Sequence, residues 1–283
     1  MKEGLFAGKK VLVMGLGRFG GGVDTARFAC RAGASVTITD LANAEELSGS
    51  ISQLKEFGDI EFHLGGHIAG DFEQTDIIIA NPAVAADNQF LGEARRFGKT
   101  VTSQMSIFFN LCPALIIGIT GANGKSTTAA LSAHLLRAGV EQEGFNYRNV
   151  WLSGNIGNEP LLTILDEIGS QDLVVLELSS FQIEQLAQEQ KAPHIALLTN
   201  LLPNHLDRYG SFEKYCAAKE SIFKYQKSSD RGRAVSFFNA DDSIGALWCE
   251  KYGGEETRTC IKFRPDDVSE EFRGRFGLPG RAL

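Results

Sequence analysis

The sequence predicts an α/β fold with two domains, each built on a mainly parallel sheet. Strand-like and helix-like stretches alternate from Lys10 to about Ala240, which is the pattern of parallel strands joined by crossover helices. Two glycine-rich loops, at 15–20 and 118–124, each stand between a strand-like and a helix-like stretch. This context is typical of anion-binding loops, so we expect two ligand sites.

The first predicted domain, residues 1–112, is Rossmann-like. A strand at 11–15 leads through the first glycine loop into a helix that runs to about Ala32, and further strands follow at 35–40, at 77–80 and near Val101. Glycines at 15, 17 and 20, with Asp40 at the end of the second strand, complete a dinucleotide fingerprint. The glycines admit a pyrophosphate and the acid binds a ribose hydroxyl. Taken alone, this loop indicates a binding site for NAD or a flavin. The alternatives are a site for another nucleoside diphosphate and a tight turn that binds no ligand.

The second predicted domain, residues 113–283, begins where the pattern restarts with a new strand and a new glycine loop. Strands are predicted at 115–117, 172–178, 195–199 and 234–238, and each ends in polar residues. Because ligands bind at the carboxyl ends of the strands in open α/β sheets, these polar residues should converge on the loop at Gly124.

The second glycine loop, Gly118-Ile-Thr-Gly-Ala-Asn-Gly-Lys-Ser-Thr127, indicates a P-loop for ATP. Its glycines let backbone N–H groups face an anion, Lys125 supplies positive charge, and the Ser126 hydroxyl suits magnesium. A strict P-loop has glycine five positions before Gly124, where this chain has Ile119. The match is therefore to a variant, and a chance glycine-rich turn is the alternative.

Three titratable residues outside the loops are candidates for chemistry. Glu177 lies in an apolar strand, where an unpaired carboxylate is costly, so we favour a magnesium ligand over a cap for nearby amides. His205 follows the strand that ends at Asn200, and a metal, substrate or structural role is open. Lys219 lies on a predicted helix, where a solvated lysine is the default. The segment 154–157 presents an amide side chain but is most simply a plain turn, and the segment 239–242 could equally hold a nucleobase or cap a helix.

Composition restricts the partners and the compartment. The net charge is −7 and there is no basic run, which argues against a nucleic-acid surface. Five scattered cysteines without a CxxC pair indicate a reducing compartment. No apolar signal segment and no run of 18 apolar residues occur. We therefore expect a cytoplasmic monomer with small-molecule partners, without nucleic acid or membrane.

In their order along the chain, these motifs resemble those of the Mur ligases, the ATP-dependent amide-forming ligases of peptidoglycan synthesis. Their variants resemble most the branch that adds D-glutamate to UDP-N-acetylmuramoyl-L-alanine, and the segment 177–182 is the most discriminating. The resemblance covers the whole chain, and the motifs that carry it lie at 121–127, 154–157, 177–182, 205–208, 218–219 and 239–242.

The resemblance implies a role for each motif. The first loop would hold UDP rather than NAD, and the residues implied for the UDP substrate are Gly15, Leu16, Gly17, Arg18, Phe19, Asp40, Asn155, Ser179 and Gln182. Those implied for ATP are Gly121, Asn123, Gly124, Lys125, Ser126, Thr127 and Asn239. Two magnesium ions are implied, one on Ser126 and Glu177 and one on His205 and Lys219. Lys219 would be carbamylated, because a carbamate offers oxygen where an ammonium repels a cation. Lys125, His205 and Lys219 would be the catalytic residues.

Several positions depart from the pattern of this family. Asn204 replaces an aspartate, Asn81-Pro-Ala83 replaces Ser-Pro-Gly, Gln104 and Ser106 replace acidic residues, and Arg18-Phe19 is unusual in the first loop. The family's third domain, which binds the amino acid, opens with a segment similar to 278–281. We therefore expect a truncated chain that binds nucleotide but does not complete ligation. A regulatory nucleotide-binding module without catalysis and an NAD-dependent oxidoreductase remain as alternatives.

Overall fold

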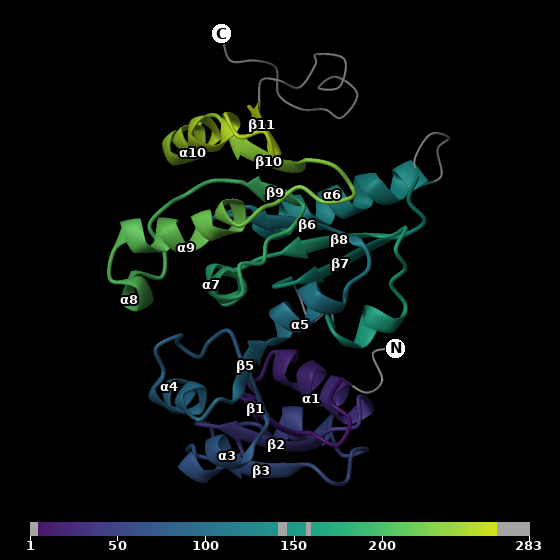
Figure 1. Ribbon diagram of the computed structural model, residues 1–283, viewed down its shortest axis with the longest axis vertical. Coiled ribbons are helices and arrows are strands. Elements are labelled where there is room, and N and C mark those ends of the chain that lie inside the picture. The colour runs from purple at the N-terminus through teal and green to yellow at the C-terminus, as the bar shows by residue number, and fades with distance from the viewer. Residues whose placement is uncertain (1–4, 141–145, 157–159, 265–283) are drawn as a thin grey trace.

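The computed structural model describes residues 5–140, 146–156 and 160–264, and it contains two stacked sheet units (Figure 1). We call β1 to β5 with their helices the first unit, and β6 to β11 with theirs the second unit. All strand pairs recorded in both sheets are parallel. The α/β class with parallel sheets is therefore confirmed. Gly157, the tail after Asp266 and the segment 278–281, all considered above, lie outside the described residues.

The first unit has the strand order β3-β2-β1-β4-β5. Its central strand β1 is apolar on both faces because helices cover both sides of the sheet, and four of its five residues are buried. The elements are β1 (Lys10–Met14), α1 (Gly21–Arg31), β2 (Ser35–Asp40), α2 (Ser48–Ser52), β3 (Glu61–Leu64), α3 (Ala69–Gln74), β4 (Ile77–Ala80), α4 (Gln89–Arg96) and β5 (Thr100–Ser103).

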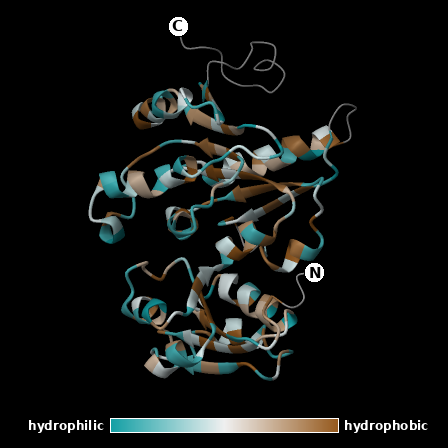
Figure 2. Ribbon diagram, in the orientation of Figure 1, coloured by the Kyte–Doolittle hydropathy of each residue, from teal (hydrophilic) through white to brown (hydrophobic). Residues whose placement is uncertain are grey.

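The second unit has the order β11-β10-β9-β6-β8-β7, with β6 and β8 inside the sheet. Its strands are the apolar centre of the unit, as the brown arrows in Figure 2 show. The elements are β6 (Leu115–Thr120), α6 (Lys125–Val140), β7 (Val150–Gly154), η1 (Thr163–Asp166), β8 (Leu173–Glu177), α7 (Ser180–Gln188), β9 (Ile195–Leu198), α8 (Leu206–Tyr209), α9 (Phe212–Lys224), β10 (Ala234–Asn239), α10 (Ser243–Gly253) and β11 (Arg258–Phe263).

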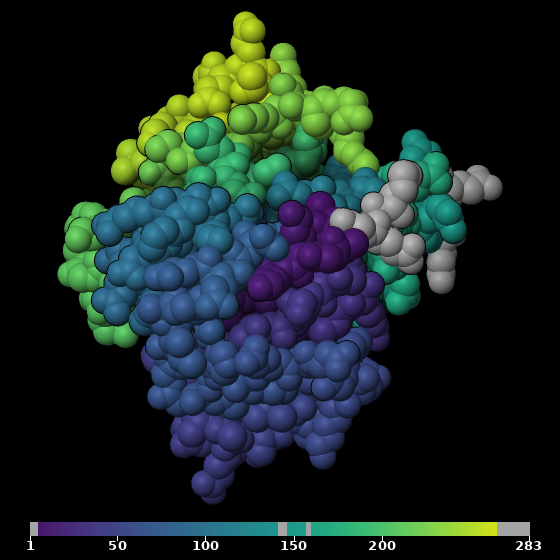
Figure 3. Space-filling model, turned by 60° about the horizontal axis from the view of Figure 1, so that its bottom comes forward, coloured from purple at the N-terminus to yellow at the C-terminus, as the bar shows by residue number. Residues whose placement is uncertain are grey.

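Helix α5 (Gln104–Leu111) connects the two units, and the predicted boundary at 112/113 falls directly after it. Ser103 caps the helix by accepting the N–H of Ser106, at 3.1 Å. Met105 and Phe108 of α5 are buried in an apolar cluster that includes residues of both units, such as Val23 and Leu161. The surfaces of the two units are accordingly continuous in the space-filling view (Figure 3).

The glycine loop of the first unit is close-packed where α1 begins. A Cβ atom at Gly22 would overlap the backbone of Leu16, so α1 approaches the loop more closely than a larger residue allows. Within the described part of the chain, no helix combines the length and apolar character needed to span a membrane.

Candidate active site

The glycine loop at 118–124, called the ATP loop after the ligand predicted for it, is held by the end of strand β9. Asn200 accepts the N–H of Ala122 on its carbonyl at 2.8 Å and that of Asn123 on its side chain at 3.0 Å. Gly121 has a φ of +148°, and a Cβ there would collide with the hydroxyl of Thr199. The expected convergence of polar strand ends on this loop is confirmed at β9.

The loop leads directly into α6, whose first residues are Lys125, Ser126 and Thr127. The Lys125 ammonium donates to the carbonyl of Ala122 at 2.8 Å, so the charge lies against the loop itself. Thr127 is exposed in the first turn. The positive end of a helix and one ammonium thus face the same loop, an arrangement that suits a polyphosphate.

Glu177 connects this loop to the edge of the sheet. Its side chain is 2% exposed at the end of β8. It accepts the Ser126 hydroxyl at 2.7 Å and the Asn155 amide at 2.9 Å. Both donors are neutral, so neither supplies a positive charge, and the carboxyl oxygens have lone pairs left for a cation. The structure therefore brings together Ser126 and Glu177, the two residues predicted for the first magnesium ion.

Lys219 is buried, with 1% of its surface exposed, on the inner face of α9. Its ammonium donates to the hydroxyl of Thr120 at 3.1 Å and lies 5.1 Å from the ring centre of Tyr215. Burial, reinforced by the charge of Lys125 and opposed by that of Glu177, lowers the pKa of Lys219 to about 7. The solvated lysine expected from the helix pattern is therefore wrong, and a large fraction of this amine is neutral near pH 7.

His205 lies close to the same ring. It is exposed, it has a φ of +51° at the start of α8, and its ring centre is 6.4 Å from that of Tyr215 and 4.9 Å from that of Phe181. Asn204 accepts the N–H of His205 at 2.9 Å. Among the described residues, no group of three or more His, Cys, Asp or Glu side chains could hold a metal ion. Magnesium at this site would need substrate oxygens, as is usual for this ion.

Other predicted contacts with ligands have partners inside the protein. Ser179 and Gln182 form a capping box at the start of α7, with the Gln182 side chain 2.9 Å from the Ser179 N–H. Asn239 donates to the carbonyl of Thr199 at 2.9 Å, so it supports the strand that holds the ATP loop. Asp242 caps α10, which is one of the two readings left open for its segment.

The glycine loop of the first unit faces the second unit across a cavity of about 250 Å³. The carboxylate of Asp40 accepts the N–H of Gly17 at 3.0 Å and therefore holds the loop in shape. Arg18 pairs with Glu46 at 2.7 Å, and Phe19 is 87% exposed beside the cavity. The residues that line the cavity include Phe19, Gly20, Arg27, Gly154, Pro160 and Thr163.

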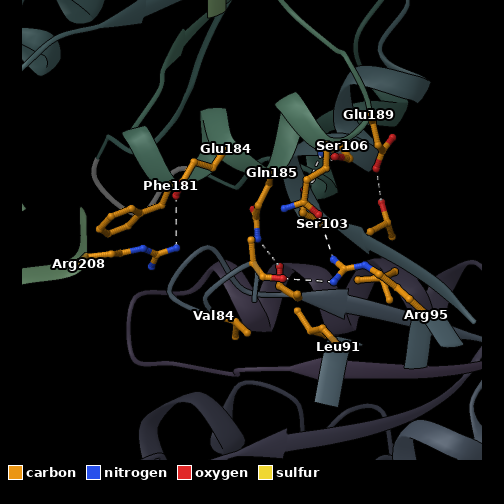
Figure 4. A pocket seen from close by; sticks show the side chains of 15 residues that line it. Val84, Leu91, Arg95, Ser103, Ser106, Phe181, Glu184, Gln185, Glu189 and Arg208 are labelled. Atoms are coloured by element: carbon orange, nitrogen blue, oxygen red, sulfur yellow. Dashed lines mark hydrogen bonds and ion pairs between the residues drawn. The ribbon is translucent and has the colours of Figure 1, made fainter. Parts of the chain in front are cut away.

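A second, smaller cavity of about 170 Å³ lies between α7 and the first unit (Figure 4). Arg95 donates to the side chain of Gln188 at 3.0 Å, and Thr102 donates to that of Glu189 at 3.1 Å. Arg208 lies 4.0 Å from the ring centre of Phe181 and donates to the carbonyl of Ala83 at 3.1 Å. These contacts join the units on the side of α5 where α4 and α7 lie.

The structure gives physical reasons for two departures from the family pattern. Asn81 donates to the carbonyl of Gly15 at 3.3 Å and so supports the first loop. Gln104 donates to the carboxylate of Asp24 at 2.7 Å, where an acidic residue would instead face a like charge. Sequence reasoning also assigned no role to Thr120, Asn200, Tyr215 and Asp24; of these, Thr120 and Asn200 carried a signal as polar residues at strand ends.

Comparison with known proteins identifies the family of this chain. Residues 119–276 match the model of the Mur ligase middle domain, and residues 9–103 match that of the MurD-like N-terminal domain of Mur ligases. The chain belongs to the Mur ligase family. The family predicted from the motifs is therefore confirmed.

Relatives in this family share sequence along most of the chain. A UDP-N-acetylmuramoylalanine–D-glutamate ligase of Roseiflexus sp. (strain RS-1) is 40% identical over 93% of this chain and 51% of its own length. A protein of the same name from Acetivibrio thermocellus is 39% identical over 93% of this chain and 52% of its own length. The chain thus spans about half the length of these Mur ligases.

A solved Mur ligase structure shares the fold. The UDP-N-acetylmuramate:L-alanyl-gamma-D-glutamyl-meso-diaminopimelate ligase of Neisseria meningitides superposes with a TM-score of 0.58. The match covers 91% of this chain and 78% of that chain, at 17% sequence identity. At this identity the likeness shows the fold alone.

Proposed function

We propose that this chain carries the nucleotide-binding part of an ATP-dependent ligase that adds D-glutamate to UDP-N-acetylmuramoyl-L-alanine. The observation that supports this most is the position of Glu177, which binds Ser126 of the ATP loop and Asn155 next to the inter-unit cavity. ATP at the loop and a substrate in the cavity would both approach this carboxylate. We also propose that the complete protein carries out the ligation as a monomer in the cytoplasm.

Each ligand has its own proposed site. The UDP diphosphate would lie on the glycine loop at 15–20 and its ribose near Asp40, and the remainder would cross the cavity toward Asn155, Ser179 and Gln182. ATP would lie on the loop at 121–127, with its base toward Asn239. The nicotinamide alternative for the first loop leaves the Lys125-Ser-Thr127 sequence without a role.

Magnesium fits the oxygen donors that Ser126 and Glu177 bring together. Ser126 and Glu177 would hold one ion, and His205 and Lys219 a second, together with phosphate oxygens. When bound, the ions would offset the negative charge of the phosphoryl group that is transferred. The depressed pKa of Lys219 supports its proposed carbamylation, because only a neutral amine can attack carbon dioxide.

The chain's own residues would support transfer of the γ-phosphoryl group to the terminal alanyl carboxylate of the substrate. Lys125 and the N–H groups of the loop would bind the phosphates and stabilise developing charge. The resulting acyl phosphate is an acyl donor, which a free carboxylate is not. The amino group of D-glutamate then attacks the acyl carbon, and phosphate leaves.

The test follows the first half of this reaction, which needs only the two nucleotide ligands. ADP release by this chain is measured with ATP, magnesium and UDP-N-acetylmuramoyl-L-alanine, with hydroxylamine present to trap the acyl phosphate as a hydroxamate. We expect release that depends on the UDP substrate and is lost in Lys125→Ala, commonly by about 100-fold or more.

The matched control is Lys55→Ala, which removes an exposed lysine of the first unit. It should retain the wild-type rate. Substrate-dependent hydroxamate formation by Lys125→Ala at a near-normal rate would overturn the proposal, as would wild-type protein that binds neither ATP nor the UDP substrate. Addition of D-glutamate tests whether these 283 residues also complete ligation.

A further inference from the structure

A buried carboxylate of the first unit reaches into the second unit. Asp24 lies in the first turn of α1, which begins at the glycine loop, and it is 6% exposed. Figure 1 shows α1 on the side of the first unit that faces the second unit. No role in the proposed reaction has been assigned to this residue.

The carboxylate accepts hydrogen bonds from consecutive residues of the second unit. Its Oδ2 accepts the N–H of Leu161 at 3.1 Å and that of Leu162 at 2.7 Å. Its Oδ1 accepts the N–H of Thr163 at 3.0 Å and also the hydroxyl of Thr163. The Gln104 amide, at the start of the connecting helix α5, donates to Oδ2 at 2.7 Å.

These hydrogen bonds restrict the orientation of α1 relative to the segment 161–163 as well as the distance between them. Among the described residues, no lysine or arginine forms an ion pair with Asp24, so its charge is balanced by N–H and O–H donors alone. Hydrogen bonds weaken steeply when their angles change. Buried donors left without a partner are also costly. A rotation of α1 against the segment 161–163 would break several of these bonds together.

The Asp24 contact differs from the other polar contacts between the units. Arg95 and Gln188 meet near the cavity of Figure 4, where their bond is exposed to water. The bonds from Asp24 to Leu161 and Leu162 are buried. An exposed contact between two long side chains holds its geometry weakly, whereas the buried carboxylate has few alternative partners.

We propose that Asp24 is a positioning residue that fixes the glycine loop of the first unit relative to the ATP loop of the second. On one side of this contact, α1 begins at the first loop; on the other, the Ser153 hydroxyl of β7, the strand paired with β8 that ends at Glu177, donates to the carbonyl of Pro160, directly before the segment 161–163, at 3.1 Å. This inference depends on the proposed function in one respect, which is that both loops serve the same reaction. Displacement of reacting groups by about 1 Å can lower a rate by about 100-fold.

The first test measures the geometry itself. Spin labels are attached through p-acetylphenylalanine at positions 55 and 134, which are exposed on the first and second units, and their distance distribution is measured by electron double resonance. We expect a single narrow distribution for the wild type. We expect a broader or shifted distribution for Asp24→Asn, which keeps the size of the side chain but turns an NH₂ group toward backbone donors. Thr163→Val, which removes one hydroxyl, should cause a smaller change.

The matched control is Asp172→Asn. Asp172 is also 6% exposed, but it binds the Trp151 indole and the Gly169 N–H, both within the second unit. Its substitution should leave the distance distribution unchanged. An Asp24→Asn distribution that superposes on the wild type would overturn the proposal, and so would an equal broadening in Asp172→Asn.

The second test measures the reaction. In Asp24→Asn, substrate-dependent ADP release should fall by about 10- to 100-fold in kcat, while the Kd values of UDP alone and of magnesium with an ATP analogue stay within about twofold. Those Kd values also show that both units are folded. An unchanged kcat would contradict positioning. If the wild type shows no ADP release, the proposed function fails, and the distance measurement still decides the role of Asp24.

Discussion

The buried amine of Lys219 predicts a pH dependence of stability that a surface lysine would not cause. The pKa of Lys219 is about 7 in the folded protein, compared with an ordinary value of 10.5. Between these two pH values the unfolded chain binds a proton that the folded chain does not, so the stability of the second unit rises with pH. Below pH 7 the Lys219 amine is protonated in both the folded and the unfolded chain, and above pH 10.5 it is protonated in neither, so it causes no pH dependence there.

The size of the effect follows from the linkage of one proton. The free energy of unfolding should rise by about 1.4 kcal/mol per pH unit inside this interval. Integrated from pH 7 to pH 10.5, the change amounts to about 5 kcal/mol, as an upper limit. Lys219→Met has a side chain of similar length without the charge, so it should be more stable than the wild type below pH 7 and should lose this pH dependence.

Urea denaturation followed by tryptophan fluorescence is a suitable assay, because both tryptophans, Trp151 and Trp248, lie in the second unit. The comparison is made from pH 6 to pH 10 in buffers free of carbon dioxide. Glu177, Lys125 and Cys216 also act on Lys219 but are present in both proteins, so the difference between the two isolates Lys219. If the free energy of unfolding varies with pH in the same way in the wild type and in Lys219→Met across this range, Lys219 is not a buried amine with a lowered pKa.

Three further predictions, made with four substitutions, test the site and the fold. Glu177→Gln should weaken binding of the magnesium–ATP analogue complex by at least about tenfold and leave metal-free binding nearly unchanged in calorimetry; equal weakening of both would contradict the metal role. Gly121→Ala should cost more stability than Gly124→Ala in denaturant unfolding, because only the first adds an overlap with Thr199 to a backbone strain of about 1–3 kcal/mol. Phe108→Ala should destabilise by about 3–5 kcal/mol, since the ring is fully buried; a loss below about 1 kcal/mol in thermal unfolding would show that α5 is not part of the core.

Apart from the edge strand β5 near Val101, the strands that sequence reasoning identified lie inside their sheets. β1 and β8 are apolar runs in the middle of their sheets, and the pattern alone reveals them. β3 has no buried residue and β11 has one, and each of these strands lies at the edge of its sheet. Edge strands in contact with water lack a continuous apolar run, so β3, β11 and a third edge strand, β7, were missed.

Within the site, the loops and Glu177 were predictable because local sequence determines their chemistry. Lys219 was not, although a signal exists: Tyr215, Ala218, Lys219, Ile222 and Phe223 share the buried face of α9 at helical spacing. A lysine inside such an apolar stripe is better evidence of a buried amine than its residue type suggests. Asp24 carried no local signal, because its backbone donors in the second unit lie more than 130 residues away in the chain.

The support that β9 gives to the ATP loop has a consequence for binding thermodynamics. Thr199 and Asn200 hold the loop through hydrogen bonds to Ala122 and Asn123 that belong to the fold itself. The conformational entropy of the loop is therefore lost during folding, and the proposed ATP ligand would not have to order it. Substitutions at the end of β9 should then lower the affinity for ATP through an unfavourable entropy of binding, although neither side chain has to touch the nucleotide.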